Sequence, residues 1–195
     1  MYRPFMKDAF KLFLFIGGRR EEIISLRWDD IYELPNGIKF FMFDNLKVMR
    51  IKKKKNTPKK FAPIYADLND FLIELGYDEK KNSNDYILFP ERDQKLITLI
   101  ELISKSFTHY RKESGITKNI SLKNLRKTYI TWVNVAMGND TGLLTSHSTQ
   151  DVIDRFYIDP KILSAIEMGA LKIKVFGENL ALKEKEGLGV KPNSL

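Results

Sequence analysis

One tyrosine and five basic residues spread along the chain carry groups suited to phosphodiester chemistry. In chain order they are Arg19, Lys55, Lys123, Arg126, His147 and Tyr157. A tyrosine hydroxyl, with an ordinary pKa of about 10, is a weak nucleophile. Two guanidinium groups that grip a phosphate make attack by that hydroxyl feasible. These residue types therefore predict cleavage of a phosphodiester by a tyrosine, with no metal ion and no other cofactor.

The first basic group follows a glycine pair, Gly17-Gly18. Glycines let the backbone turn tightly, so an arginine directly after them can point into a cleft. Arg19 is the candidate for this role, and the resemblance described below favours it through the spacing to Glu22. Arg20 is the alternative assignment. The simpler interpretation is a helix boundary with solvated arginines.

Six lysines lie within residues 52–60, in a loop that also contains Asn56-Thr57-Pro58. Lysine runs usually face solvent or contact phosphate groups without sequence preference. Contacts with the DNA backbone are predicted for Lys52, Lys53, Lys54, Lys59 and Lys60.

Two further basic groups share one helix face. Lys123 and Arg126 are three residues apart in a helical pattern, so both can reach one phosphate. A basic amphipathic helix is the simpler alternative. His147 follows in a separate segment, and a lone histidine is more often structural than catalytic. His109 lies in a polar helical pattern, and we expect it at the surface.

The order and local contexts of these residues resemble the catalytic domain of the tyrosine recombinases, the phage integrase family. Residues 19–22 match its Arg-x-x-Glu, and residues 26–31 match its Leu-x-Trp-x-Asp-Ile. Residues 125–128, Leu-Arg-Lys-Thr, match the motif around its second arginine, although Lys123 stands where histidine is usual. Residues 143–148 resemble its Leu-Leu-Gly-His-Ser, with Ser146 in place of glycine. The resemblance covers residues 5–171.

The resemblance implies a role for each group. Arg19 and Arg126 would hold the phosphate, and Tyr157, at the family's distance beyond the histidine, would be the nucleophile. Lys55 corresponds to a lysine that protonates the leaving oxygen, and its spacing to Pro63 favours it over Lys54. Lys123 and His147 would supply hydrogen bonds, with His147 the better proton acceptor.

The same resemblance implies double-stranded DNA as substrate and a tetramer on DNA for the full-length protein, with a monomer in isolation. It also implies a clamp domain ahead of the catalytic one, which we expect to be absent from this chain. Two rival functions stay open. One is a type IB topoisomerase-like enzyme that nicks and closes single duplexes, and the other is a DNA-binding relic without catalysis.

The expected fold is α+β and mainly helical, with a three-stranded antiparallel sheet. Strands are predicted at 38–43, 46–51 and 61–65, with a turn at 35–37. Hydrophobic periodicity predicts helices over residues 5–16, 20–27, 67–75, 94–112, 121–137, 141–146, 150–157 and 160–171. Residues 78–85 are expected to form a polar loop. Residues 172–176 suggest an edge strand or docking segment, packed on its own core or exchanged with a neighbouring protomer.

Length and composition limit the remaining choices. The chain has 195 residues, 43% of them hydrophobic, which suits one globular domain over residues 1–182 with a mobile tail at 183–195. The 33 basic and 25 acidic residues give a net charge of +8, which favours a polyanionic partner. Without cysteine, a disulfide framework and thiolate chemistry are excluded. We expect a cytoplasmic protein with no membrane partner.

Overall fold

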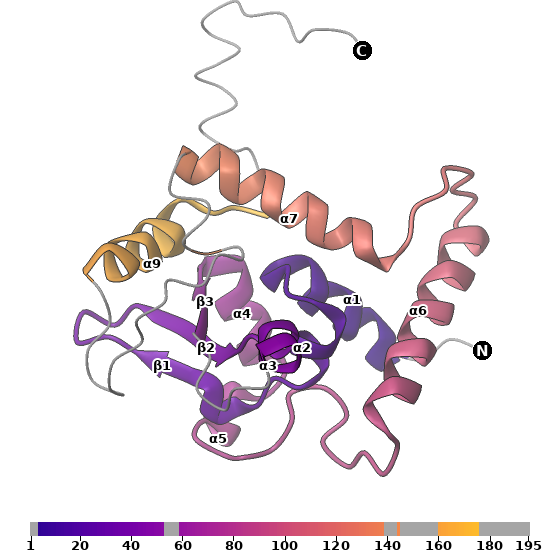
Figure 1. The fold of residues 1–195 in the computed structure, drawn as a ribbon, viewed down its shortest axis with the longest axis horizontal. Coiled ribbons are helices and arrows are strands. Elements are labelled where there is room, and N and C mark those ends of the chain that lie inside the picture. The colour runs from indigo at the N-terminus through magenta and orange to yellow at the C-terminus, as the bar shows by residue number, and fades with distance from the viewer. Residues whose placement is uncertain (1–3, 53–58, 139–143, 145–159, 176–195) are drawn as a thin grey trace, which may run out of the picture.

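The computed structural model describes residues 4–52, 59–138, 144 and 160–175. The described chain is mainly helical, with one small sheet (Figure 1). The elements are α1 (Pro4–Ile16), α2 (Arg20–Ile24), η1 (Trp28–Asp30), β1 (Ile31–Glu33), β2 (Lys39–Asp44), α3 (Leu46–Lys52), β3 (Lys59–Ile64), α4 (Ala66–Glu74), α5 (Tyr77–Lys80), α6 (Leu96–Glu113), α7 (Leu122–Met137) and α9 (Pro160–Lys172).

Helix α1 lies at the centre of the helical part of the molecule. It contacts α2, α6 and α7, and α7 in turn contacts α9 (Figure 1). Apolar residues on α1, among them Leu12 and Phe13, are buried in the main core. Helix α7 begins after Ser121, whose backbone N–H donates to the Asn124 side chain at 2.9 Å, and it ends at Gly138. The N-terminal ends of α2 and α7 are therefore positioned by helices packed on one another.

The sheet is antiparallel, with strand order β1-β2-β3. Phe41 pairs with Ile31 on one side and with Ala62 on the other. The turn between β1 and β2 is closed by a 2.8 Å hydrogen bond from the Leu34 N–H to the Ile38 carbonyl. Helix α9 packs on β2 and β3, so β3 is buried along most of its length. The fold class is confirmed as a mainly helical α+β arrangement with a three-stranded antiparallel sheet.

The strand predicted at residues 46–51 is wrong, and strand β1 was not predicted from the sequence. Residues 46–51, predicted as the middle strand, form helix α3, which starts with a 3.0 Å bond from the Met49 N–H to the Asn45 carbonyl. A short run with Val48 and Ile51 suits either a strand or a helix turn, and periodicity alone does not separate them. Both edges of β2 are instead occupied by β1 and β3.

Other predicted elements agree to within a few residues. Helices α1, α4, α6, α7 and α9 occur where periodicity placed them. Helix α2 ends at Ile24 rather than at residue 27, and α5 stands at the start of the predicted polar loop. The predicted helices at 141–146 and 150–157 and the tail lie largely or wholly outside the described residues. No helix in the described part of the chain combines the length and apolar character needed to span a membrane.

Candidate functional site

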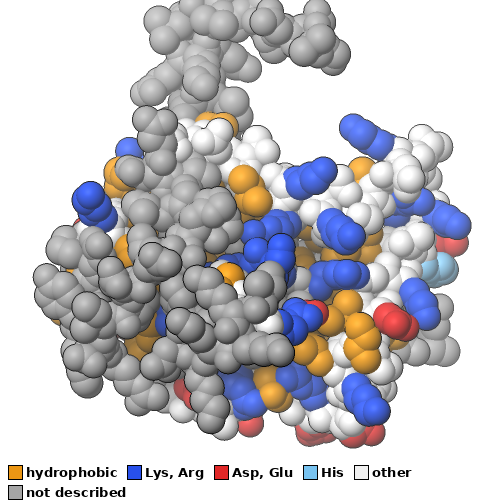
Figure 2. Space-filling model, viewed as in Figure 1, with side chains coloured by type: hydrophobic (Ala, Val, Ile, Leu, Met, Phe, Trp, Pro, Cys, Tyr) orange, Lys and Arg blue, Asp and Glu red, His pale blue; other side chains and the backbone are white. Residues whose placement is uncertain are grey.

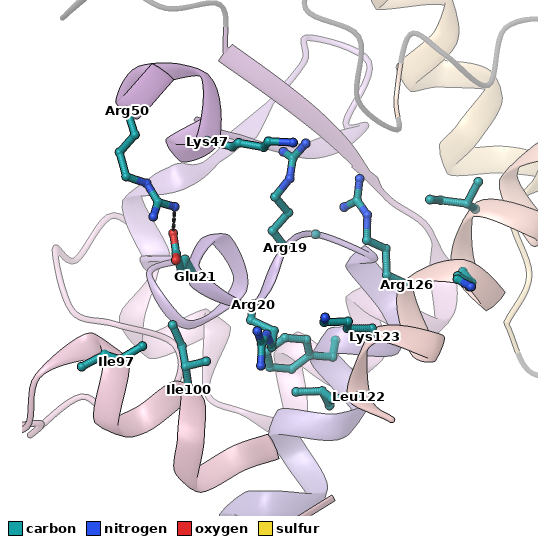
Figure 3. A pocket seen from close by; sticks show the side chains of 14 residues that line it. Arg19, Arg20, Glu21, Lys47, Arg50, Ile97, Ile100, Leu122, Lys123 and Arg126 are labelled. Atoms are coloured by element: carbon teal, nitrogen blue, oxygen red, sulfur yellow. Dashed lines mark hydrogen bonds and ion pairs between the residues drawn. The ribbon is translucent and has the colours of Figure 1, made fainter. Parts of the chain in front are cut away.

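A pocket of about 520 Å³ opens between the N-terminal ends of α2 and α7, with α3 and α6 on its other sides (Figure 3). Basic and apolar side chains both line it. The basic lining residues are Arg19, Arg20, Lys47, Arg50, Lys123, Arg126 and Lys127. The apolar lining residues are Phe13, Ile97, Ile100, Leu122 and Ile130. Figure 2 shows basic side chains gathered over this part of the surface.

The turn after α1 needs its glycines. Gly17 has φ +61°, and a Cβ added there would lie 2.1 Å from Cδ1 of Tyr129 on α7. A Cβ on Gly18 would lie 2.6 Å from Cδ1 of Ile23. Any side chain at Gly17 would therefore push α7 away from the end of α1. The expectation that these glycines allow a tight turn is confirmed.

Arg19 follows this turn directly and caps α2. Its backbone N–H donates to Oε2 of Glu22 at 2.7 Å, and its Nη1 donates to Oε1 of the same carboxylate at 2.9 Å. Nη1 also lies 3.2 Å from Oδ1 of Asn45, a buried residue between β2 and α3. The guanidinium is one-third exposed at the pocket. These contacts fix its position while leaving part of it accessible to a ligand.

The Glu22 carboxylate is fully buried and has a second cation. Nζ of Lys60, from β3, lies 2.7 Å from Glu22 Oε2. Burial raises the pKa of Glu22, but Lys60 and Arg19 outweigh it, so the pKa is lowered overall. Burial lowers the pKa of Lys60 to about 8, against the opposing effect of Glu22. At pH 7 both groups are therefore charged.

Arg126 reaches the same part of the pocket from α7. Its Nη1 donates to the carbonyl oxygen of Gly17, which lies two residues before Arg19. Burial, and then the neighbouring charge of Arg19, lower the pKa of Arg126. Arg19 and Arg126 point to the same side of the pocket (Figure 3), and Lys123 lines it one turn earlier on α7. Three of the six predicted catalytic residues are thus brought together.

Arg20, the alternative to Arg19, also lines the pocket but faces α6. Its Nη1 donates to the Ser104 hydroxyl at 3.0 Å. It makes no contact with Glu22 comparable to that of Arg19. The arginine that neighbours Arg126 is therefore Arg19, the one with glutamate three residues later.

Two pocket residues were missed from the sequence, Lys47 and Arg50. Both come from α3, the segment predicted as a strand. Lys47 extends across the pocket toward Arg19, and Arg50 forms an ion pair with Glu21 (Figure 3). A helix puts residues three apart on one face, and that spacing was the signal available in the sequence.

The described lysines of residues 52–60 do not share one environment. Lys59 is part-exposed and pairs with Asp44 at 2.7 Å. Lys60 was predicted to contact the DNA backbone, and that prediction is wrong. Its side chain is 8% exposed and its ammonium forms an ion pair with Glu22, so it does not lie on the surface. Lys52 ends α3, and its side chain lies outside the described atoms.

The other predicted residues lie outside the described residues. They are Lys53, Lys54, Lys55, His147 and Tyr157. Within the described ranges, no three His, Asp or Glu side chains gather as a metal site would require. No protein-family model, curated protein or solved structure matches this chain significantly.

Proposed function

We propose that this chain is the catalytic domain of a site-specific DNA recombinase, which cleaves and rejoins duplex DNA through a tyrosine. The observation that carries the proposal is the meeting of Arg19 and Arg126 at one pocket, with Lys123 beside them. These are the residues that the sequence selected as phosphate ligands, and Arg19 is far from the other two along the chain.

The pocket has the electrostatics that phosphodiester cleavage requires. Two guanidinium groups held close together repel one another, and this repulsion adds to burial, the larger cause, in lowering the pKa of Arg126. A phosphate between them removes that repulsion and accepts charge-assisted hydrogen bonds from both. In the transition state the phosphate oxygens gain negative charge, so the fixed cations stabilise it more than the ground state. Because the contacts of Arg19 with Glu22 and Asn45 exist beforehand, little reorganisation is needed.

The chemistry assigned to the remaining residues completes the proposal. The Tyr157 hydroxyl attacks phosphorus, the bond to the 5′ oxygen breaks, and a 3′-phosphotyrosine forms. His147 accepts the tyrosine proton, and Lys55 donates a proton to the departing 5′ oxygen, which leaves as a hydroxyl. Lys123 contributes a hydrogen bond to the phosphate. The reverse sequence of steps rejoins the strand, on the same duplex or on another held by a further protomer.

A nicked suicide duplex tests the proposal. Cleavage releases the short fragment that carries the free 5′ hydroxyl, and without that hydroxyl the strand cannot be rejoined. We expect a covalent protein–DNA band in excess chelator. Arg126→Gln should reduce its rate of formation by about 10²- to 10³-fold, as removal of one oxyanion donor does. Lys105→Gln is the matched control: that side chain is 80% exposed on α6, outside the pocket, and should leave the rate unchanged. Absence of a band from the unsubstituted protein would contradict the proposal.

A further inference from the structure

Lys60 has a position that neither its surroundings in sequence nor the proposed mechanism anticipates. We propose that Lys60 is a positioning residue, which fixes the Arg19 guanidinium through Glu22 and whose proton makes phosphate binding at the pocket dependent on pH. The inference rests on the proposed function only in taking DNA as the source of the phosphate.

The geometry links Lys60 to the pocket through one carboxylate. Glu22 Oε2 accepts from Lys60 Nζ and from the Arg19 backbone N–H, both at 2.7 Å, and Oε1 accepts from the Arg19 guanidinium at 2.9 Å. The carboxylate is therefore held by three donors in a site closed to water. Without Lys60, Oε2 would keep one described donor, and the restraint on the orientation of Glu22 would weaken. The position of Arg19 depends on that orientation.

The charges around Lys60 come from every side of this cluster. Glu22 lies on α2, Arg19 on the turn before it and Arg126 on α7, while the Phe43 ring on β2 has its centroid 5.9 Å from Nζ. Three cations and one carboxylate give this cluster a charge of +2 when Lys60 is protonated and +1 when it is not. Burial is the largest cause of the lowered pKa of Lys60, and the two arginines lower it further.

The sign of the pH effect follows from linkage. The pKa of Lys60 is about 8 in the folded protein, so its proton is lost as pH rises through that value. A phosphate bound between Arg19 and Arg126 stabilises the protonated form, and by reciprocity the protonated form binds phosphate more tightly. The affinity of the pocket for phosphate is therefore highest below about pH 8, and it falls as the pH rises above that value. A purely structural ion pair would affect folding but would not impose this profile on binding.

The first experiment compares DNA binding by the full chain between pH 6.5 and 9.5 at fixed ionic strength, using fluorescence anisotropy of a labelled duplex. From pH 7 to pH 9 the affinity of the unsubstituted protein should fall by about threefold to fivefold, which is the part of a fivefold to tenfold coupling that a pKa of about 8 places in this range. Lys60→Met should remove that fall. Lys105→Met, which alters an exposed lysine on α6 outside the pocket, should retain it. Identical pH profiles for the unsubstituted protein and Lys60→Met would overturn the inference.

The second experiment needs no DNA, and it uses a substituted protein only to assign one signal. The protein is labelled with ¹³Cε-lysine, and the Lys60 signal, assigned by its loss in Lys60→Arg, is titrated with and without inorganic phosphate. We expect a midpoint near pH 8 that rises by about 0.7 to 1 unit with phosphate, the same coupling converted to a pKa. A midpoint that phosphate leaves unchanged would overturn the inference. A phosphate-linked midpoint in a protein that binds no DNA would support it and defeat the proposed function.

Discussion

Arg126 on α7 donates a hydrogen bond to the carbonyl oxygen of Gly17, at the turn that ends α1. The same turn carries Arg19, so this contact and those of Arg19 with Glu22 and Asn45 together set the separation of the two guanidinium groups. Tyr129, one turn later on α7, packs its ring against Gly17, where a side chain would not fit. The pocket therefore depends on close approach between the end of α1 and the first half of α7.

Gly17→Ala is expected to destabilise the protein by more than its backbone strain alone. An alanine at positive φ costs about 1–2 kcal/mol, and overpacking against Tyr129 adds about 1–3 kcal/mol. Gly37→Ala is the matched control, since φ is +80° and a Cβ there would meet nothing within 4 Å. Urea unfolding of both variants measures the difference. Equal losses of unfolding free energy would show that the α1–α7 approach is not tight.

The sequence predicted the elements whose periodicity is long enough to be unambiguous. Helix α7 and its cap could be read from Ser121, Gly138 and the apolar residues between them. Helix α3 could not, because residues 46–52 are too short for their apolar spacing to separate a helix from a strand. That error also hid Lys47 and Arg50.

The candidate site was predicted only where residue type and spacing determine position. Arg19, chosen over Arg20 by its spacing to Glu22, is the arginine that forms an ion pair with Glu22. The partnership of Glu22 with Lys60 joins α2 to β3 and depends on tertiary packing that no local spacing encodes. A lysine in a basic run is ordinarily solvated, so its burial could not be inferred from composition.

Lys47 is expected to contribute one ionic contact to DNA binding. Each phosphate contact that is removed lowers the slope of log affinity against log salt concentration by about 0.9. Lys47→Ala should reduce the slope by that amount and weaken binding similarly for different sequences. Lys81→Ala, an exposed lysine after α5 and outside the pocket, should keep the original slope. A normal slope for Lys47→Ala would exclude this pocket from the DNA interface.

Lys55 is expected to protonate the leaving oxygen. Lys55→Ala should slow formation of the covalent complex by about 10²- to 10⁴-fold, which is the usual contribution of a general acid. A substrate with sulfur at the bridging 5′ position has a leaving group that needs no proton, and it should restore the rate. Lys54→Ala is the control for register. If sulfur restores Lys54→Ala and not Lys55→Ala, the assignment within the lysine run is wrong.

The segment after α9 is docked on its own chain as far as it is described. Ile173 and Val175 are buried, and the Val175 N–H donates to Oδ2 of Asp67 at 3.0 Å. No strand forms over residues 172–175, contrary to the edge-strand interpretation. Truncation after Leu171 should therefore lower the melting temperature of the monomer, with a loss of unfolding free energy of about 3–6 kcal/mol for the two buried side chains.

Truncation after residue 182, which removes only the tail predicted to be mobile, is the control for this segment, and it should leave the melting temperature unchanged. If the chain truncated after Leu171 melts normally but fails to assemble paired complexes on DNA, residues 172–176 act by exchange between protomers. That result would contradict local docking.

The proposed mechanism requires that Tyr157 be the residue that becomes covalently attached to DNA. The suicide duplex is reacted with the unsubstituted protein, with Tyr157→Phe and with Tyr32→Phe, which alters an exposed tyrosine on β1. The proposed mechanism predicts that the unsubstituted protein and Tyr32→Phe form the covalent complex and that Tyr157→Phe does not. It also predicts a similar DNA affinity for all three proteins. Mass spectrometry of the digested complex should find a nucleotide on Tyr157. Covalent complex formed by Tyr157→Phe, or a nucleotide attached elsewhere, would contradict it.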